Sequence, residues 1–408
     1  MNGRLREYAE IVGSGYIDEL RIIADRLRGK RFQHINSTAV GGGVAEILTR
    51  MVPMLRELGV DTAWDTIKGS QAFFEVTQAF HNALHGRPGA VTAEMFDIFQ
   101  ATAEMNCREM SITGDIIMVH DPEPICLVNR KADVGRKWIW RCHLDVSTPN
   151  TKVWNFLRDY VEDYDATIFS MPDFAQKVTV PQYMVPPSID PLSDRNRELD
   201  DATVEAVLEK YGIDPSRPIL IQVSRFDRMR DPLGVVASYR KVKRRHDCQL
   251  VLATADPTAS LDGAGFVREV QREAERDSDI HVLELPPFSD LDINALVRGS
   301  TVVIQKSIRE GFGLGVSEAL WKKKPVIGGA AGAIKPQVVN GVTGYLVHSP
   351  EGAATRALQL LADAPLRARM GENGHEHVRR NFLLTRHAAD YLLAMLALYH
   401  PNQDMVNL

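Results

Sequence analysis

The feature that most constrains the fold is a strand, a glycine-rich turn and a helix that follow one another between residues 302 and 327. Residues 302–304 are a short β-branched run, typical of a parallel strand that is buried on both faces. Gly311 and Gly313 then allow a sharp turn and a close approach of the backbone to a ligand. The helix predicted after the turn carries the lysines at 322–324 in its last turn, where cations suit the helix dipole.

A helix that begins at such a turn directs free N–H groups and its positive end toward a phosphate. Glu310 precedes the turn and Glu318 follows it, with Lys306 and Ser307 upstream. Two carboxylates would repel a diphosphate, so they fit better as acceptors for hydroxyl groups, one on a sugar and one on a ribose. The alternative is a plain strand–helix unit with surface glutamates. The glycines and the spacing favour a nucleotide-sugar site.

Short apolar strands alternate with helices along both halves of the chain, which predicts an α/β fold with mostly parallel sheets. A segment with three prolines in a dozen residues, 183–194, predicts a stiff, non-helical hinge. Residues 358–399 are predicted to be helical throughout. Strands are predicted at 31–36, 115–119, 137–141, 166–170, 219–224, 249–253, 281–285, 301–305, 325–328 and 344–347.

The 408 residues suit two domains that each bury a core. We expect residues 1–190 to form the first domain, with a helical lead-in over the first 30 residues. Residues 191–385 are expected to form the second domain. Residues 386–408 are expected to form a helix that packs back on the first domain.

Composition argues against several classes of partner. With a net charge of −5, the chain lacks the basic surface that nucleic acid or an anionic membrane would require. The four cysteines lack ligand spacing, which predicts neither a disulfide framework nor a zinc site and suits a reducing cytoplasm. We find no apolar run of membrane-spanning length and no signal-peptide core, so a cytoplasmic location is expected.

Two further clusters lie where predicted strands end, the edge at which open α/β sheets bind ligands. Gly41, Gly42 and Gly43 separate a strand from a helix and form a second candidate anion site, although the dinucleotide fingerprint spacing is absent. Arg225 and Arg230 follow another strand and could clamp a diphosphate through bidentate hydrogen bonds. The alternative there is a solvated loop with local Arg–Asp pairs.

The histidines are judged separately as catalytic candidates, because a lone histidine is more often structural than catalytic. His34 and His85 are interpreted as structural for that reason. His143 is the better candidate, because Arg141 and Asp145 share its strand end.

Together these motifs resemble a family of enzymes. The segments 224–226, 310–314 and 318–320, with a cation five residues after Arg225, are similar to the retaining nucleotide-sugar glycosyltransferases of the GT-B fold. A narrower resemblance, to trehalose glycosyltransferring synthases, covers essentially the whole chain. It rests on the segments 36–38, 41–48, 138–143, 186–193 and 305–314.

The resemblance implies a GT-B architecture, in which two Rossmann-like βα domains face a central cleft. It implies transfer of glucose from a nucleoside-diphosphate glucose to free glucose, which gives α,α-trehalose with retention in a reaction that often runs reversibly. It implies small-molecule partners alone, namely the nucleoside-diphosphate glucose, glucose and trehalose, with no metal and no separate cofactor. The nucleotide base and the oligomeric state stay open, with a homodimer as one option.

Two alternatives to this activity remain. One is a retaining trehalose phosphorylase on the same scaffold. The other is a non-catalytic protein that binds a sugar or a nucleotide.

By motif match, the resemblance assigns catalytic roles to His143, Arg225, Arg230 and Glu310. The arginines would neutralise the diphosphate, Glu310 would hold the hydroxyls of the donor sugar, and Glu318 would hold the ribose. The family usually has lysine where this chain has Arg230, and arginine keeps the charge but not the shape. The full set of expected donor-binding residues is Gly41, Gly42, Gly43, Arg225, Arg230, Glu310, Gly311, Phe312, Gly313, Leu314 and Glu318.

On the acceptor side, the resemblance implies that His143 contacts the sugar at the reacting centre. Asp121 and Asp145 are expected near the acceptor. Since no carboxylate nucleophile is implied, the expected mechanism is substitution on one face of the sugar. The leaving phosphate then accepts the acceptor's proton, and catalysis rests on stabilising the leaving group.

Overall fold

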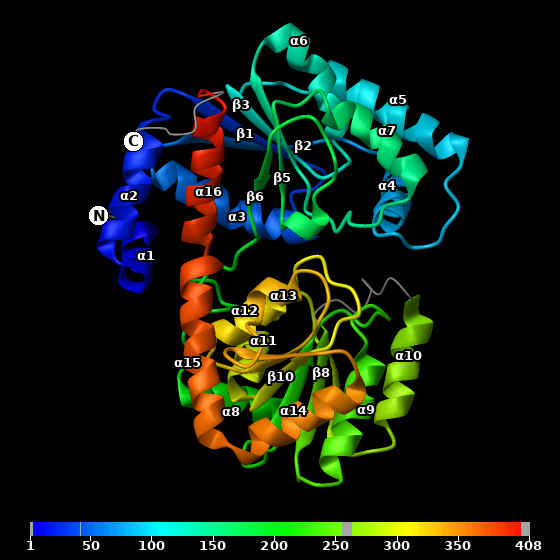
Figure 1. Cartoon of the computed structure of the whole chain (residues 1–408), viewed down its shortest axis with the longest axis vertical. Coiled ribbons are helices and arrows are strands. Elements are labelled where there is room, and N and C mark those ends of the chain that lie inside the picture. Colours follow the sequence, from blue (N-terminus) through cyan, green and yellow to red (C-terminus); the bar gives the residue numbers. More distant parts are fainter. Residues whose placement is uncertain (1–2, 41, 255–262, 401–408) are drawn as a thin grey trace. The chain divides into compact units, whose positions relative to one another are not determined.

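The computed structural model describes residues 3–40, 42–254 and 263–400, and they form two compact units. Unit 1 extends to Pro187 and resumes at Leu384, and unit 2 is Ser188–Leu383. The sequence predicts domain limits at residues 190 and 385, within a few residues of these boundaries. In Figure 1 each unit is a twisted sheet with helices against both faces.

Unit 1 is built on a parallel sheet of six strands in the order β2-β1-β3-β4-β5-β6. In chain order the strands are β1 (Arg31–Asn36), β2 (Asp61–Thr66), β3 (Ile116–His120), β4 (Lys137–Arg141), β5 (Ala166–Phe169) and β6 (Gln182–Met184). The predicted strands correspond to β1, β3, β4 and β5, and these predictions are confirmed. The sequence interpretation missed β2 and β6, which form the two edges of the sheet.

Two helical layers cover this sheet (Figure 1). One layer contains α1 (Arg4–Val12), α2 (Ser14–Asp25), α3 (Gly42–Glu57) and the returning helix α16 (Leu384–Ala397). The other contains α4 (Gln71–Leu84), α5 (Ala93–Glu109), α7 (Thr151–Val161) and the short turns η1 (Ile125–Arg130) and α6 (Lys131–Val134). Between strands and helices lies an aromatic core that includes Phe73, Phe80, Phe99, Trp140 and Phe169.

Unit 2 has a second parallel sheet of six strands, in the order β12-β11-β10-β7-β8-β9. Its strands are β7 (Ile219–Val223), β8 (Gln249–Thr254), β9 (Ile280–Glu284), β10 (Val302–Gln305), β11 (Val326–Gly329) and β12 (Gly344–Val347). All six match predicted strands. The helices are α8 (Asp201–Lys210), α9 (Pro232–Lys243), α10 (Gly263–Ala274), α11 (Asp290–Gly299), α12 (Leu314–Trp321), α13 (Ile334–Gln337), α14 (Pro350–Ala362) and α15 (Ala364–Asn381).

The prediction of one helical segment over residues 358–399 is wrong. Asp363 leaves the helical conformation between α14 and α15, and its carboxylate accepts the N–H of Leu366 at 2.8 Å, which caps α15. Phe382 separates α15 from α16, and its carbonyl accepts the N–H of Ile189 at 2.9 Å. The break lets α15 end unit 2 and α16 enter unit 1. Within the described residues, no helix is long and apolar enough to span a membrane.

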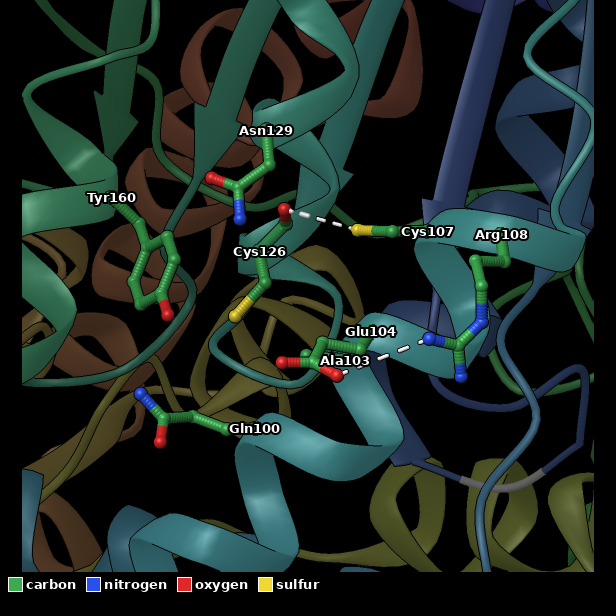
Figure 2. A pocket seen from close by; sticks show the side chains of 8 residues that line it. All are labelled: Gln100, Ala103, Glu104, Cys107, Arg108, Cys126, Asn129 and Tyr160. Carbon is green, nitrogen blue, oxygen red and sulfur yellow. Dashed lines mark hydrogen bonds and ion pairs between the residues drawn. The ribbon is translucent and has the colours of Figure 1, made fainter.

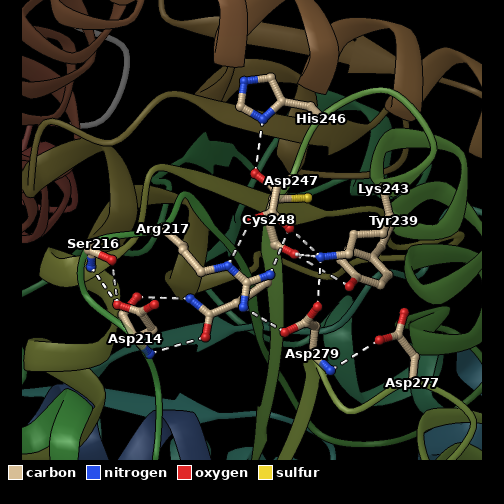
Figure 3. Close-up of polar contacts among 11 residues, drawn as sticks. Asp214, Ser216, Arg217, Tyr239, Lys243, His246, Asp247, Cys248, Asp277 and Asp279 are labelled. Carbon is tan, nitrogen blue, oxygen red and sulfur yellow. Dashed lines mark hydrogen bonds and ion pairs between the residues drawn. The ribbon is translucent and has the colours of Figure 1, made fainter.

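A charged network holds the amino ends of three neighbouring strands in unit 2 (Figure 3). Arg217, just before β7, lies 2.8 Å from an oxygen of Asp247, before β8, and 2.7 Å from an oxygen of Asp279, before β9. Lys243 Nζ contacts both carboxylates at 2.6 Å. Because ligands bind at the carboxyl ends of such strands, this network has a structural role.

The network predicts an acid-sensitive contribution to stability. Hydrogen bonds from Arg217 and Lys243 lower the pKa of Asp279 well below its usual value. A lowered carboxyl pKa stabilises the fold above the unfolded pKa of about 4, and the contribution is lost as pH falls toward the folded pKa. We expect Asp279→Asn to lower the free energy of unfolding at pH 7 by about 1 kcal/mol, a small value because solvent screens the pairs.

Thermal unfolding from pH 7 down to pH 3 measures this difference, which should shrink at the acid end. Glu275→Gln is the matched control, because it removes an exposed carboxylate that directly follows α10 and is not part of the network. An Asp279→Asn effect that is the same at every pH would contradict the electrostatic explanation.

Candidate functional site

The glycine-rich turn of unit 2 lies at the carboxyl end of β10 and leads into α12. Gly313 has φ 73° and ψ 63°, a left-handed conformation that glycine adopts without strain, and it immediately precedes Leu314. Gly313, the N-cap residue of α12, makes no side-chain capping hydrogen bond, which suits an anion site at the start of a helix. Gly332 packs so closely that a Cβ there would lie 1.9 Å from the carbonyl oxygen of Glu310.

The three lysines do not lie in the last turn of α12, and that prediction is wrong. The helix ends at Trp321, and Lys323 adopts a positive φ of 59°. Lys322 is buried, and its Nζ donates to Asn196 Oδ1 at 2.8 Å and to the carbonyl of Glu318 at 3.1 Å. Burial lowers the pKa of Lys322 to about 7.

Glu310 and Arg230, which were predicted as separate ligand contacts, form an ion pair. Arg230 Nη2 lies 2.9 Å from Glu310 Oε1, with the side chains 17% and 3% exposed. Arg230 Nη1 also donates to the carbonyl of Arg309 at 2.8 Å, and Ser307 Oγ donates to Glu310 Oε2 at 3.1 Å. The carboxylate that the sequence assigns to a sugar is therefore held by a cation and a hydroxyl of the protein itself.

The other charged residues of the loop between β7 and α9, residues 224–231, pair in different ways. Arg225 is 41% exposed, and its Nη2 lies 3.6 Å from Asp227 Oδ2, the kind of local pair that the alternative reading of the loop anticipates. Asp231 instead accepts from Lys306 Nζ, and Arg228 pairs with Glu269 at 3.3 Å on the outer side of the loop. Arg225, Arg230 and Lys306 thus bring three cations to the carboxyl ends of the neighbouring strands β7 and β10.

Glu318, the candidate ribose contact, also has a cationic partner. Arg195 Nε lies 3.2 Å from Glu318 Oε2, and Arg195 Nη1 lies 2.9 Å from Asp290 Oδ1. Sequence reasoning missed Arg195, because it follows the proline-rich connector and no local motif marks it.

Gln337, a second residue that sequence reasoning missed, supports the glycine-rich turn through hydrogen bonds. The buried side chain of Gln337 accepts the N–H and the Oγ–H of Ser317, at 3.1 and 2.6 Å. Its amide donates to the carbonyls of Phe312 and Ala333. One side chain therefore ties α12, its preceding turn and α13 together, which holds the start of α12 in place.

In unit 1, the structure brings Asp121 and His143 together at the ends of β3 and β4. Asp121 has a positive φ of 62°, rare for a residue other than glycine, and its Oδ1 accepts the backbone N–H of His143 at 2.7 Å. Burial, together with the nearby Glu123 carboxylate, raises the pKa of Asp121 to about 7. Strain and a raised pKa at one strand end are typical of functional sites.

Asp145 and Arg141 are less directly joined to His143. Asp145 Oδ1 accepts the N–H and Oγ–H of Ser147, at 3.0 and 2.5 Å. Arg141 is fully buried, and its Nη2 donates to the carbonyl of Val185 at 2.7 Å, so it serves the interior of unit 1.

The triple-glycine site is described only in part. Gly41 lies outside the described residues, and α3 begins at Gly42. A Cβ at Gly43 would meet no atom within 4 Å, so the helix start there is open.

A polar pocket of about 370 Å³ lies elsewhere in unit 1, beside α5 (Figure 2). No residue of the predicted site lines it. Its lining residues are Gln100, Ala103, Glu104, Cys107, Arg108, Cys126, Asn129 and Tyr160.

Comparison with known protein families gives one match in each half of the chain. Residues 34–176 match the family described as "Trehalose synthase, N-terminal domain". Residues 204–377 match the family described as "Glycosyl transferases group 1". The two matches contain every predicted site residue.

Individual relatives agree with these families. A trehalose synthase of Thermococcus litoralis is 41% identical over 395 residues, which are 95% of this chain and 96% of that protein. A trehalose phosphorylase of Pleurotus pulmonarius is 27% identical, over 95% of this chain but only 60% of the fungal protein.

Among solved structures, an α,α-trehalose-phosphate synthase (UDP-forming) from Burkholderia vietnamiensis superposes with a TM-score of 0.70. It is 15% identical and covers 91% of this chain and 100% of that one. Such neighbours are GT-B glycosyltransferases, which confirms the predicted fold class.

Proposed function

This chain belongs to the trehalose synthase family of glycosyltransferases, and on that premise we propose that it transfers glucose from a nucleoside-diphosphate glucose to free glucose, forming α,α-trehalose. The observation that most supports this reaction is a group of polar features at the carboxyl ends of the strands β7 and β10 in unit 2. An uncapped helix start, the guanidiniums of Arg225 and Arg230 and the carboxylate of Glu310 gather there. A diphosphate and a sugar each find complementary groups in that set.

Arg230 and Glu310 exchange partners when the donor binds. The guanidinium of Arg230 pairs with the buried carboxylate of Glu310 at 2.9 Å. An arriving diphosphate gives Arg230 a second anion, and Glu310 can then accept hydrogen bonds from the hydroxyls of the glucosyl group. The ion pair thus orients both side chains in advance, which lowers the reorganisation needed in the transition state.

The transfer itself breaks the bond between glucose C1 and the diphosphate oxygen. A hydroxyl oxygen of the acceptor forms the new bond to C1 on the same face, and its proton passes to the leaving diphosphate. The configuration is therefore retained, and the same groups serve the reverse reaction. Since Arg225 and Arg230 can carry the countercharge, the proposal requires no metal ion and no other cofactor.

On the acceptor side, we assign Asp121 and His143 to the glucose that receives the transfer, with Asp145 nearby. Their support is local. The two residues are joined at 2.7 Å at adjacent strand ends, and the raised pKa of Asp121 lets its carboxyl either donate or accept near neutral pH. Glu318, with Arg195, is assigned to the ribose of the donor.

One assay tests the reaction. The protein is incubated with glucose and, separately, with UDP-, ADP- and GDP-glucose, and the products are examined for a non-reducing disaccharide and a free nucleoside diphosphate. Formation of trehalose with one of the donors is the expected result. The absence of disaccharide with every donor, in spite of measured donor binding, would indicate a non-catalytic binding protein.

The phosphorylase relative makes a second activity worth a direct test. Trehalose with inorganic phosphate and no nucleotide should give no glucose 1-phosphate if the proposal holds. Phosphate-dependent cleavage would replace the synthase assignment by a phosphorylase.

We also expect the partners of the enzyme to be these small molecules, and neither nucleic acid nor a membrane. The expected location is the cytoplasm. Light scattering would decide between a monomer and a homodimer.

A further inference from the structure

Three histidines form a continuous chain across three neighbouring strands of unit 1. His34 Nδ1 lies 2.9 Å from His120 Nε2, and His120 Nδ1 lies 3.0 Å from His143 Nε2. The rings are stacked, with centroids 5.2 and 5.3 Å apart. His34 lies on β1, His120 ends β3, and His143 follows β4, so the sheet order β1-β3-β4 sets the chain.

The inner end of the chain is sealed from water. His34 and His120 are 0% and 1% exposed, and Tyr391 of α16 packs against His34 with ring centroids 6.1 Å apart. Nε2 of His34 is buried without a hydrogen-bond partner among the described residues. At the other end His143 is half-buried, and its Nδ1 makes no hydrogen bond in the described part of the chain.

All three rings are held neutral, which limits each to one proton. Burial lowers the pKa of His34 to about 3, and burial likewise brings the pKa values of His120 and His143 well below the usual value. A neutral imidazole has one N–H donor and one bare nitrogen acceptor. The two hydrogen bonds therefore run in the same direction along the chain, either from His34 to His143 or the reverse.

The unpartnered nitrogen of His34 decides between the two directions. If the bonds ran from His143 inward, His34 would accept at Nδ1 and carry its proton on Nε2, which would leave a buried N–H without an acceptor. If they run outward, Nε2 of His34 is a bare acceptor. Buried N–H groups without partners are rarer in proteins than acceptors that are not fully used, so the outward direction is favoured.

We propose that His34 and His120 are positioning residues that fix His143 in the tautomer with its proton on Nδ1, so that His143 presents an N–H donor to an oxygen of the substrate. The donor's use rests on the proposed function, in which His143 touches the sugar. Its orientation rests only on the two hydrogen bonds and on the buried end of the chain.

Nitrogen NMR tests the tautomer directly. Two-bond ¹H–¹⁵N spectra of the full-length protein, labelled with ¹⁵N-histidine, distinguish a protonated ring nitrogen from a bare one, and His143→Gln identifies the His143 signals. We expect Nδ1 of His143 to be protonated and Nε2 to be bare. A His143 ring that carries its proton on Nε2 in the unmodified protein would overturn the proposal.

Two variants test whether the chain sets that tautomer. His34→Leu removes the first donor, and His120→Phe removes the link, so both should move part of the His143 proton to Nε2. Phe80→Leu is the control for a general loss of packing, because Phe80 is buried among other aromatic rings and touches none of the three histidines. A His143 tautomer that stays unchanged in both histidine variants would reject the positioning role.

Kinetics test the use of the N–H. In His120→Phe we expect kcat for trehalose formation to fall about tenfold with a smaller change in KM, the pattern for an interaction strengthened in the transition state. Unchanged kcat despite an altered tautomer would show that the substrate does not use this donor. Because the tautomer is read on the free protein, its failure is separate from a failure to make trehalose.

Discussion

Replacing Arg230 or Arg225 by alanine is expected to reduce kcat/KM for trehalose formation roughly 30- to 900-fold, which corresponds to about 2–4 kcal/mol of lost transition-state stabilisation. In the proposed reaction, each change removes a guanidinium that would offset the negative charge on the leaving diphosphate. Arg230→Lys restores the residue that the resemblance leads one to expect. It should retain most of the activity or raise it, because the positive charge stays although the shape and reach of the side chain change.

The comparison needs two safeguards. Arg230→Ala leaves the buried Glu310 without its cation, and Arg225→Ala removes the cation 3.6 Å from the buried Asp227, so thermal unfolding must be measured for each variant. Arg228→Ala is the matched control, because Arg228 lies on the same loop but pairs outward with Glu269. Equal and small losses at all three arginines would mean that the loop is an ordinary solvated one.

Glu310→Gln should preserve the fold and lower kcat/KM roughly 13- to 160-fold, or about 1.5–3 kcal/mol of transition-state stabilisation, because a carboxylate acceptor for sugar hydroxyls becomes a weaker neutral one. The amide keeps the size of the carboxylate and can still meet Ser307, 3.1 Å away in the native protein. Glu269→Gln, a glutamate in an exposed pair with Arg228, provides the control. Near-normal kinetics of Glu310→Gln would remove Glu310 from the site.

The ion pair adds a test that activity alone cannot give. Combining Arg230→Ala with Glu310→Gln should recover part of the stability that Arg230→Ala loses, because no charge is then buried without a partner. Strictly additive losses in unfolding free energy would contradict the pairing at 2.9 Å.

All six strands of unit 2 and the four interior strands of unit 1 were predictable, and the two edge strands of unit 1 were not. β3, β4 and β10 are buried on both faces and read as short apolar runs. β2 pairs with a neighbour on one side only and is polar and partly exposed, so DTAWDT carries no such signal. β6 has three residues and lies beside prolines, which the sequence marks as a connector.

The candidate site shows the same limit at the level of side chains. The turn before α12 could be predicted, because glycines, a strand and a helix start are local features. The partners of its charged groups could not. Arg230 reaches Glu310 across 80 positions of the chain, and His34 reaches His120 across 86. Those contacts depend on the order of strands within each sheet, which no local pattern encodes.

The return of α16 to unit 1 determines which unit can complete its folding first during synthesis. The ribosome releases residues 3–187 first, then the whole of unit 2, and Leu384–Ala397 only afterwards. Unit 2 is continuous in the chain and can complete its core as one block. Until Tyr391 emerges, the buried face of His34 stays open to water. The half of the protein that is translated first is thus the last to be finished.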